Sequence, residues 1–442
     1  MDDLMRWMAD RLRAEFKPAV GCTDPAAVAA AVAAAAERLG RRDPDRLRRI
    51  RVELSPNIFK NGFAVEIPGA SDRGHPMAAA LGFVMGRSAR GFDIFRGLSD
   101  ADIRSARRLI GEGKVEVACS NRGGELSIRV RIESEGEEPV EALVRKDYLN
   151  VVRIRVVGRV VWRKRAGADG RTMLKRGVAF FDLVDFAETC PLEQLDFVAE
   201  GIRMNRAFVE EGRRQPLGLR IGERVRDILR AGGPGRAGRA VVADREHGFT
   251  ADLGLKIREA VSSGVDARMG GLPLPVMSSA GSGNLGIAGT IPLAVVCGHY
   301  GLPDEKLIRA VALANLVHVY LKEETGRLTA ICGGVLVGMG LSAAIAWLLG
   351  GTRGQIAGAV KNMAANVTGM ICDGANSGCA LKVGASAAEA WYAAVFALNG
   401  SLADSSVGIV SDDVDKTIRH VIRLVTQMSR LDADILNMIG EA

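Results

Sequence analysis

The alternation of apolar and polar residues divides this chain into two unlike halves. Residues 113–162 alternate in short runs separated by Gly- and Glu-rich turns, which predicts an antiparallel sheet with one wet face. Past residue 240, apolar residues recur with helical periodicity and long stretches carry no charge. The sequence therefore predicts an α+β fold, with a mixed α/β N-terminal half followed by a mostly all-α half.

The 442 residues are enough for two or three domains. We expect a mixed α/β domain over residues 1–230, with N-terminal helices and a sheet at about 49–162. An all-α domain is expected over 231–442, joined through the Gly-rich stretch 231–240. In the first domain, residues 1–20 predict a helix ending near Pro18, and residues 49–68 predict a strand, a turn and a strand.

Two uncharged runs, residues 275–303 and 328–352, are each long enough to cross a bilayer. Glycines and polar residues interrupt both runs, which favours helices buried inside a large helical domain. A membrane or transport protein stays the alternative from another class. The N-terminal segment is amphipathic and lacks the pattern of a signal peptide, so we expect a cytoplasmic protein with reduced thiols.

The net charge of +7 gives no clear sign of a polyanionic partner. Nucleic-acid binding proteins cluster their basic residues on one face, interleaved with aromatic residues. Apart from the short run at residues 46–51, the basic residues are scattered, and aromatic residues make up only 5% of the chain. We therefore expect no nucleic-acid partner. Because the two uncharged runs favour buried helices, we expect no membrane partner either.

The segment MICDGANSGCALK places Cys372 and Cys379 on either side of a Gly/Asn/Ser turn, and Cys332 lies forty residues upstream of Cys372. Two thiols across a tight turn, with a third from a separate helical segment, suit an iron–sulfur cluster that leaves one iron open. The spacing within the pair is not standard for zinc or ferredoxin sites. Three buried core cysteines are the alternative, because free cysteine is among the most buried residue types.

Cys22 directly precedes an Ala-rich helix that begins in the segment GCTDP. The unpaired N–H groups and the dipole of that helix favour a thiolate, although a small residue filling space is the other interpretation. Lys60 and Lys382 flank the notable motifs. Either lysine could bind a carboxylate or act as a base if desolvated, whereas a solvated charge is the default.

The segment AGSGNLGIAG has G-x-G-x-x-G spacing, but no second strand ending in an acid follows it. A dinucleotide site is therefore disfavoured. A Gly/Ser/Asn turn that opens a helix can still hold a small carboxylate, with Ser282 and Asn284 as side-chain donors. His299 and His318 lie in apolar helical surroundings, which is typical of core histidines with satisfied hydrogen bonds.

Several segments occur in a specific order between Gly21 and Lys382: GCTDP, SPNIFKNG followed by PG, SSAGSGNLGI, and CGG followed by ICDGANSGCALK. This ordered set resembles the L-cysteine desulfidase family, which is related to the iron–sulfur L-serine dehydratases. The serine dehydratase alpha chains share the back half more loosely, because their cysteine pair is wider apart.

The resemblance implies a [4Fe-4S] enzyme that works without pyridoxal phosphate and eliminates sulfide from L-cysteine, giving pyruvate and ammonia. By this resemblance Cys332, Cys372 and Cys379 would hold three irons, and the fourth iron would stay open to substrate. Cys22 matches the remaining family cysteine, which could be a base, a transient fourth ligand or a sulfur acceptor.

The chemistry that this reaction needs leaves several assignments open. A base must take the Cα proton, and Cys22, Lys60 or Lys382 could do so. The substrate carboxylate needs N–H and hydroxyl donors, for which we expect Ser282, Asn284 and the turn from Ser55 to Asn57. A dehydratase acting on L-serine is the nearest alternative. A small amino acid is the expected partner, and a homodimer is left open.

Overall fold

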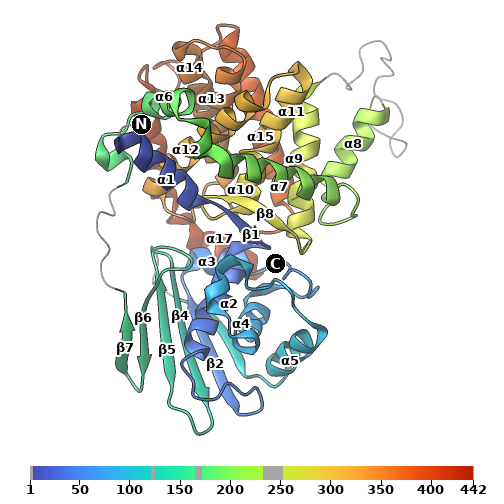
Figure 1. The fold of residues 1–442 in the computed structure, drawn as a ribbon, viewed down its shortest axis with the longest axis vertical. Helices are drawn as coiled ribbons and strands as arrows, with labels where there is room; N and C mark the ends of the chain where they lie inside the picture. The colour runs from blue at the N-terminus through green and yellow to red at the C-terminus, as the bar shows by residue number, and fades with distance from the viewer. Residues whose placement is uncertain (1–2, 121–124, 165–171, 232–251, 442) are drawn as a thin grey trace.

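The computed structural model describes residues 3–120, 125–164, 172–231 and 252–441. A sheet covered by helices forms one end of the molecule, and a larger bundle of helices forms the other (Figure 1). Each end has its own hydrophobic core. The predicted α+β fold, with a sheet in the first half and helices in the second, is confirmed.

The sheet lobe contains six strands in the spatial order β3-β2-β4-β5-β6-β7, antiparallel except for the parallel pair β2 and β3. Its strands are β2 (Leu47–Leu54), β3 (Val115–Cys119), β4 (Ser127–Ser134), β5 (Val140–Arg145), β6 (Val151–Val156) and β7 (Arg159–Arg163). The alternation in β4 buries Ile128, Val130 and Ile132 and leaves the arginines between them exposed. One face is therefore wet, as the pattern predicted.

The dry face is covered by α2 (Thr23–Ala36) and α4 (Gly74–Met85), with α5 (Asp100–Gly111) beside them. Alanine fills most of α2, and every residue of that helix is buried. A Cβ atom at Gly82 of α4 would lie 2.3 Å from the carbonyl oxygen of Ala29. The two helices thus touch backbone to backbone, which small side chains alone permit.

The second lobe is built around the long helices α12, α13 and α15. Its helices are α6 (Phe180–Thr189), α7 (Asp196–Gly212), α8 (Ile221–Ala231), α9 (Leu253–Met269), α10 (Gly283–Ala288), α11 (Ile291–Tyr300), α12 (Asp304–Thr325), α13 (Gly333–Leu348), α14 (Arg353–Val367), α15 (Cys379–Leu398), α16 (Val414–Met428) and α17 (Leu431–Glu441). Other helices surround α13, which explains its uncharged sequence. In the described parts of the chain, no helix is long and apolar enough to cross a membrane.

The start of the chain packs into this helical lobe. Helix α1 (Asp3–Glu15) contacts α12, and β1 (Phe16–Val20) pairs antiparallel with β8 (Pro275–Ser279). The expected helix up to Pro18 is therefore wrong in its last turn, because the chain is already extended from Phe16 onward. Helices α6 and α7 also belong to this core.

The expected strand, turn and strand at residues 49–68 is only half right. After β2 the chain forms α3 (Pro56–Gly62), with Ser55 as N-cap and Pro56 at the first helical position. Proline at that position favours helix entry, so the segment SPN starts a helix where a turn was expected. The expected Gly-rich linker at 231–240 lies outside the described residues except for Ala231, and the boundary after residue 230 stays a prediction.

Candidate active site between the two lobes

A short antiparallel bridge joins the segments that carry Cys332 and Cys372. Ile331 pairs with Ile371, the N–H of Cys332 donates to the Met370 carbonyl at 2.8 Å, and the N–H of Cys372 donates to the Ala330 carbonyl at 2.7 Å. Residues next to a bridged pair project to the opposite face from that pair. Both cysteines therefore lie on the same face of this bridge.

The loop after Cys372 returns the chain to Cys379, the first residue of α15. Gly374 in this loop has φ +107°, and a Cβ atom there would lie 2.5 Å from the Lys60 carbonyl oxygen. Glycine is required on both grounds. Cys332 is the N-cap of α13, so two of the three thiols lie at helix N-termini.

The three thiols interact electrostatically and none forms a disulfide. Burial raises the pKa of Cys332 to about 12, and charge on Cys372 or Cys379 raises that pKa further. Burial also raises the pKa of Cys379 to about 11. In the protein alone these two thiols are protonated at neutral pH.

This arrangement suits a cluster better than a single ion. Among the residues that the structure describes, no three His, Cys, Asp or Glu side chains converge closely enough to hold one metal ion. A [4Fe-4S] cluster places each thiolate on a different iron, so its ligands stand further apart. Coordinated iron also deprotonates a thiol, and a hydrogen bond from the Gly334 backbone already favours the thiolate of Cys332. Three cysteines whose thiols interact in this way are the type of donor that iron–sulfur clusters use.

Lys60 and Lys382 both lie beside the cysteine loop, and both have a carboxylate partner. The Lys60 ammonium is buried and donates to the Cys372 carbonyl at 2.7 Å and to Asp432 Oδ1 at 2.5 Å. The Lys382 ammonium lies 2.6 Å from Asp373 Oδ1, and a quarter of its side chain is exposed. The structure thus brings α3, the cysteine loop and the start of α17 together.

Cys22 is the N-cap of α2 and so directly precedes that helix, as expected. The preceding Gly21 has φ +70°, and a Cβ atom there would overlap the Pro68 ring. The Cys22 thiol donates to Asp24 Oδ2 at 3.5 Å. Burial, and then the charge of Asp24, raise the pKa of Cys22 far above its usual value, so the helix N-terminus does not produce the expected thiolate. Burial also raises the pKa of Asp24 to about 6.

Arg268 connects the Cys22 segment with the Gly/Ser/Asn turn. Its guanidinium donates to the Gly21 carbonyl at 2.5 Å and to Asn284 Oδ1 at 3.1 Å. Ser282, at the start of α10, closes the turn through backbone hydrogen bonds with Ser279. Asn284 and Cys22 are therefore linked through one buried arginine.

Ser55 and Asn57, the other two expected substrate ligands, bind each other. The Ser55 hydroxyl donates to Asn57 Oδ1 at 2.6 Å, and both residues are buried. Asn57 Oδ1 also accepts from the Ile58 N–H. These polar groups stabilise the first turn of α3, the helix that carries Lys60.

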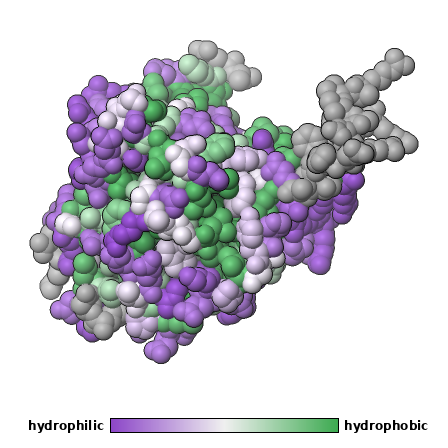
Figure 2. Space-filling view, turned by 90° about the horizontal axis from the view of Figure 1, so that it is seen from above, coloured by the Kyte–Doolittle hydropathy of each residue, from purple (hydrophilic) through white to green (hydrophobic). Residues whose placement is uncertain are grey.

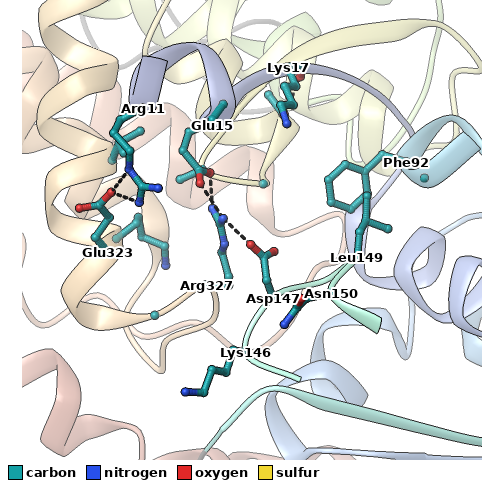
Figure 3. A pocket seen from close by; sticks show the side chains of 18 of the residues that line it. Arg11, Glu15, Lys17, Phe92, Lys146, Asp147, Leu149, Asn150, Glu323 and Arg327 are labelled. Atoms are coloured by element: carbon teal, nitrogen blue, oxygen red, sulfur yellow. Dashed lines mark hydrogen bonds and ion pairs between the residues drawn. The ribbon is translucent and has the colours of Figure 1, made fainter. Parts of the chain in front are cut away.

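A cavity of about 1000 Å³ lies between the two lobes. Its walls come from α1, β1, the 3₁₀ helix Ser88–Asp93, the turn after β5, the turn after β8 and the end of α12. Arg327 crosses the cavity, pairing with Glu15 and, at 2.7 Å, with Asp147 of the sheet lobe, while Arg11 pairs with Glu323 (Figure 3). The pair between Arg327 and Asp147 joins the two lobes across the cavity, whereas the other two pairs tie α1 to the end of α12 and to the loop after it within the helical lobe.

The wall of this cavity contains Lys322, which the sequence analysis missed. Only 6% of Lys322 is exposed, and within the described residues its ammonium has no hydrogen-bond or ion-pair partner. Burial and the charge of Arg327 lower the pKa of Lys322 to about 7, although Cys372, Cys332 and Asp24 act in the opposite direction. The sequence feature that could have pointed to Lys322 is a lysine near the end of a long apolar helix.

His318, one helical turn before Lys322, was expected to be a core histidine with satisfied hydrogen bonds. Its Nδ1 is hydrogen-bonded to Ser279 Oγ at 2.8 Å, but its buried Nε2 has no partner in the described structure. Burial, Lys322 and Arg327 lower the pKa of His318 well below its usual value, so the ring is neutral. Ala280, after Ser279, has the strained φ of +46°.

Comparison with known proteins gives one consistent family. A family model described as the serine dehydratase alpha chain matches residues 104–437. The chain is 34% identical to the UPF0597 protein of Bacteroides thetaiotaomicron over 436 residues, covering 97% of this chain and 96% of that protein. It is 36% identical to the UPF0597 protein HRM2_02820 of Desulforapulum autotrophicum, with coverage of 97% and 96%. It is also 34% identical to the UPF0597 protein YhaM of Shigella sonnei, with coverage of 96% and 95%. With its cysteine loop, its glycine turns and this match over most of its length, the chain belongs to the serine dehydratase alpha-chain family.

Proposed function

We propose that this protein is a β-eliminating lyase that uses a [4Fe-4S] cluster, without pyridoxal phosphate, to convert L-cysteine to pyruvate, ammonia and sulfide. The observation that carries the proposal is the grouping of Cys332, Cys372 and Cys379, of which Cys332 and Cys372 act electrostatically on Lys322 in the cavity wall. Family membership supports the lyase class. The choice of cysteine as substrate rests on the ordered motifs of the sequence.

In this proposal Cys332, Cys372 and Cys379 hold three irons. The cluster would supply Lewis-acid chemistry to the leaving group. The protein supplies the remaining functions: it excludes water, orients the amino acid and moves one proton. Ser282, Asn284, Ser55 and Asn57 are our proposed ligands for the substrate. Of these, Ser55 and Asn57 would have to exchange their mutual hydrogen bond for the carboxylate.

The candidates for the Cα base that the sequence offers are Cys22, Lys60 and Lys382, and each would have to change its protonation or its partner. Lys60 would have to leave Asp432, and Lys382 would have to leave Asp373. Cys22 would have to lose a proton that burial stabilises. As a transient ligand Cys22 would also have to lose that proton, which a coordinated iron would displace.

The same site could act on L-serine, and the family description favours that second candidate. The two reactions differ in whether a thiolate or a hydroxide leaves. The test is to purify the protein without oxygen, measure iron and acid-labile sulfide, and then assay sulfide release from L-cysteine and pyruvate formation from L-serine. An iron-free protein that is inactive on both amino acids would refute the proposal.

A homodimer and a cytoplasmic location remain predictions. Seen from the helical end, apolar side chains form bands between polar ones (Figure 2). The exposed apolar residues of this lobe include Tyr300, Phe396 and Leu402. Sedimentation of the purified protein would establish whether it associates.

A further inference from the structure

The end of α12 brings to the cavity wall a lysine that has no partner among the residues that the structure describes. Lys322 lines the cavity, and the groups that act on its ammonium come from other segments: Asp24 from α2, Arg327 from the loop after α12, and Cys332 and Cys372 from the cysteine bridge. We propose that Lys322 is the base that removes the Cα proton of the substrate. This inference rests on the proposed lyase function and names one further catalytic residue for it.

The lack of a partner among the described residues distinguishes Lys322 from the other two lysines near the site, one of which, Lys60, is equally buried. Lys60 and Lys382 each bind a carboxylate, and that ion pair occupies the ammonium group. Lys322 has no such partner among the described residues, and a buried lysine without a counter-ion favours the neutral amine. A neutral amine has the free electron pair that proton abstraction requires.

The groups around Lys322 are consistent with this role. His318 lies four residues earlier on α12, so the two side chains share one face of the helix. The histidine is neutral, while Arg327 contributes a fixed positive charge. Asp24, and Cys332 and Cys372 once they are thiolates, attract a proton on Lys322, so the amine can hold the proton that it has accepted.

The proposed step is balanced. The Lys322 amine forms a bond to the Cα proton, and the electrons of the Cα–H bond form the Cα–Cβ double bond. The Cβ–S bond breaks, and its electron pair leaves with sulfur as sulfide. The 2-aminoacrylate that remains tautomerises and takes up water, giving pyruvate and ammonium. Lys322 then returns its proton to solvent or to the departing sulfide.

Three variants separate the role of the base from cluster binding. Lys322→Arg keeps a cation that cannot accept a proton at neutral pH, and Lys322→Met keeps the length of an apolar side chain. Lys306→Arg is the control, because Lys306 lies on the same helix and packs over the Trp347 ring, away from the cavity. Each anaerobic protein is assayed for iron and sulfide content, for L-cysteine elimination, and for exchange of the Cα proton of L-alanine in D₂O. L-Alanine has no leaving group, so its exchange reports proton removal alone.

Both Lys322 variants should keep the cluster and lose elimination and exchange by about 100-fold or more, a typical contribution of a general base. The Lys306→Arg control should match the wild type. Either Lys322 variant eliminating sulfide within about tenfold of the wild type would overturn the inference alone. A wild-type protein that lacks iron or is inactive would overturn the proposed function, and this inference with it.

The melting temperature, which does not depend on catalysis, tests whether the buried Lys322 ammonium lacks a partner. Lys322→Met should melt at the same temperature as the wild type or higher at neutral pH, since it removes an uncompensated polar group. A clear fall in the melting temperature of Lys322→Met, with the control unchanged, would show that the lysine is a structural partner and would overturn the inference.

Discussion

The buried ion pair between Lys60 and Asp432 provides a sharp test of what Lys60 does. The two side chains are 1% and 9% exposed, and their charged atoms lie 2.5 Å apart. With an effective dielectric constant near 20, attraction at that distance is about 7 kcal/mol, and desolvation of both ions takes back several kcal/mol. Removing one partner leaves the other charge buried and alone. We therefore expect Lys60→Met or Asp432→Leu to lower the free energy of unfolding by about 3–5 kcal/mol.

The double variant Lys60→Met/Asp432→Leu separates structure from catalysis. Replacing a buried pair by apolar residues of similar size is often nearly neutral, so the double variant should recover most of the stability that each single variant loses. If Lys60 only docks α17 and the Cys372 carbonyl, iron content and elimination should recover with stability. Urea unfolding of the anaerobic proteins gives the free energies, and iron analysis and sulfide release give the function.

Two results would refute this reasoning. Single variants that lose less than about 1 kcal/mol would show that the pair behaves like a solvated surface pair. A stable double variant that holds its cluster but cannot eliminate sulfide would show that Lys60 itself takes part in the reaction. The second result would return Lys60 to the position of base and argue against Lys322.

Three further outcomes are expected. Cys372→Ala should lose the cluster, whereas Cys22→Ala should keep at least part of its iron and lose turnover; iron and sulfide analysis beside the elimination assay would check both. Gly374→Ala should lower the free energy of unfolding by at least about 2 kcal/mol, because Gly374 has a φ of +107° and its Cβ would contact the Lys60 carbonyl. The control Gly369→Ala should melt like the wild type, because no atom of the described residues lies within reach of a Cβ at that position. The stability advantage of Lys322→Met over the wild type should be largest below pH 7 and shrink towards pH 10.5, since the folded wild-type chain binds fewer protons than the unfolded chain over that range. An advantage that is independent of pH in urea titrations would contradict this last prediction.

Local signals in the sequence predicted much of the fold. The start of α2 was readable because Pro25 and the residues before it form a helix-entry pattern, and the sheet was readable because its strands have one wet face. Helix α3 was missed because Ser-Pro-Asn is compatible with either a turn or a helix start. The helix packs against the cysteine loop, and this contact between distant segments cannot be seen in the sequence.

The site could be predicted only in part, because it too depends on contacts between distant segments. The cysteines were identifiable as a set by their motifs, but their convergence depends on the bridge between Ile331 and Ile371, which joins distant segments. Lys322 could not be found by motif, because its chemistry comes from burial beside Arg327 and from the lack of a counter-ion. A lysine is ordinary in sequence and becomes unusual only when its surroundings are known.

The pairing of β1 with β8 has a consequence for the order in which the chain can fold during synthesis. The residues that build the sheet core lie between Ala26 and Ile154, so that lobe can close while the rest of the chain is still being made. Phe16 must wait for Ser279 before its strand has a partner. Until then the backbone of β1 has no strand to pair with, and a chaperone that binds the nascent N-terminus would find that edge open.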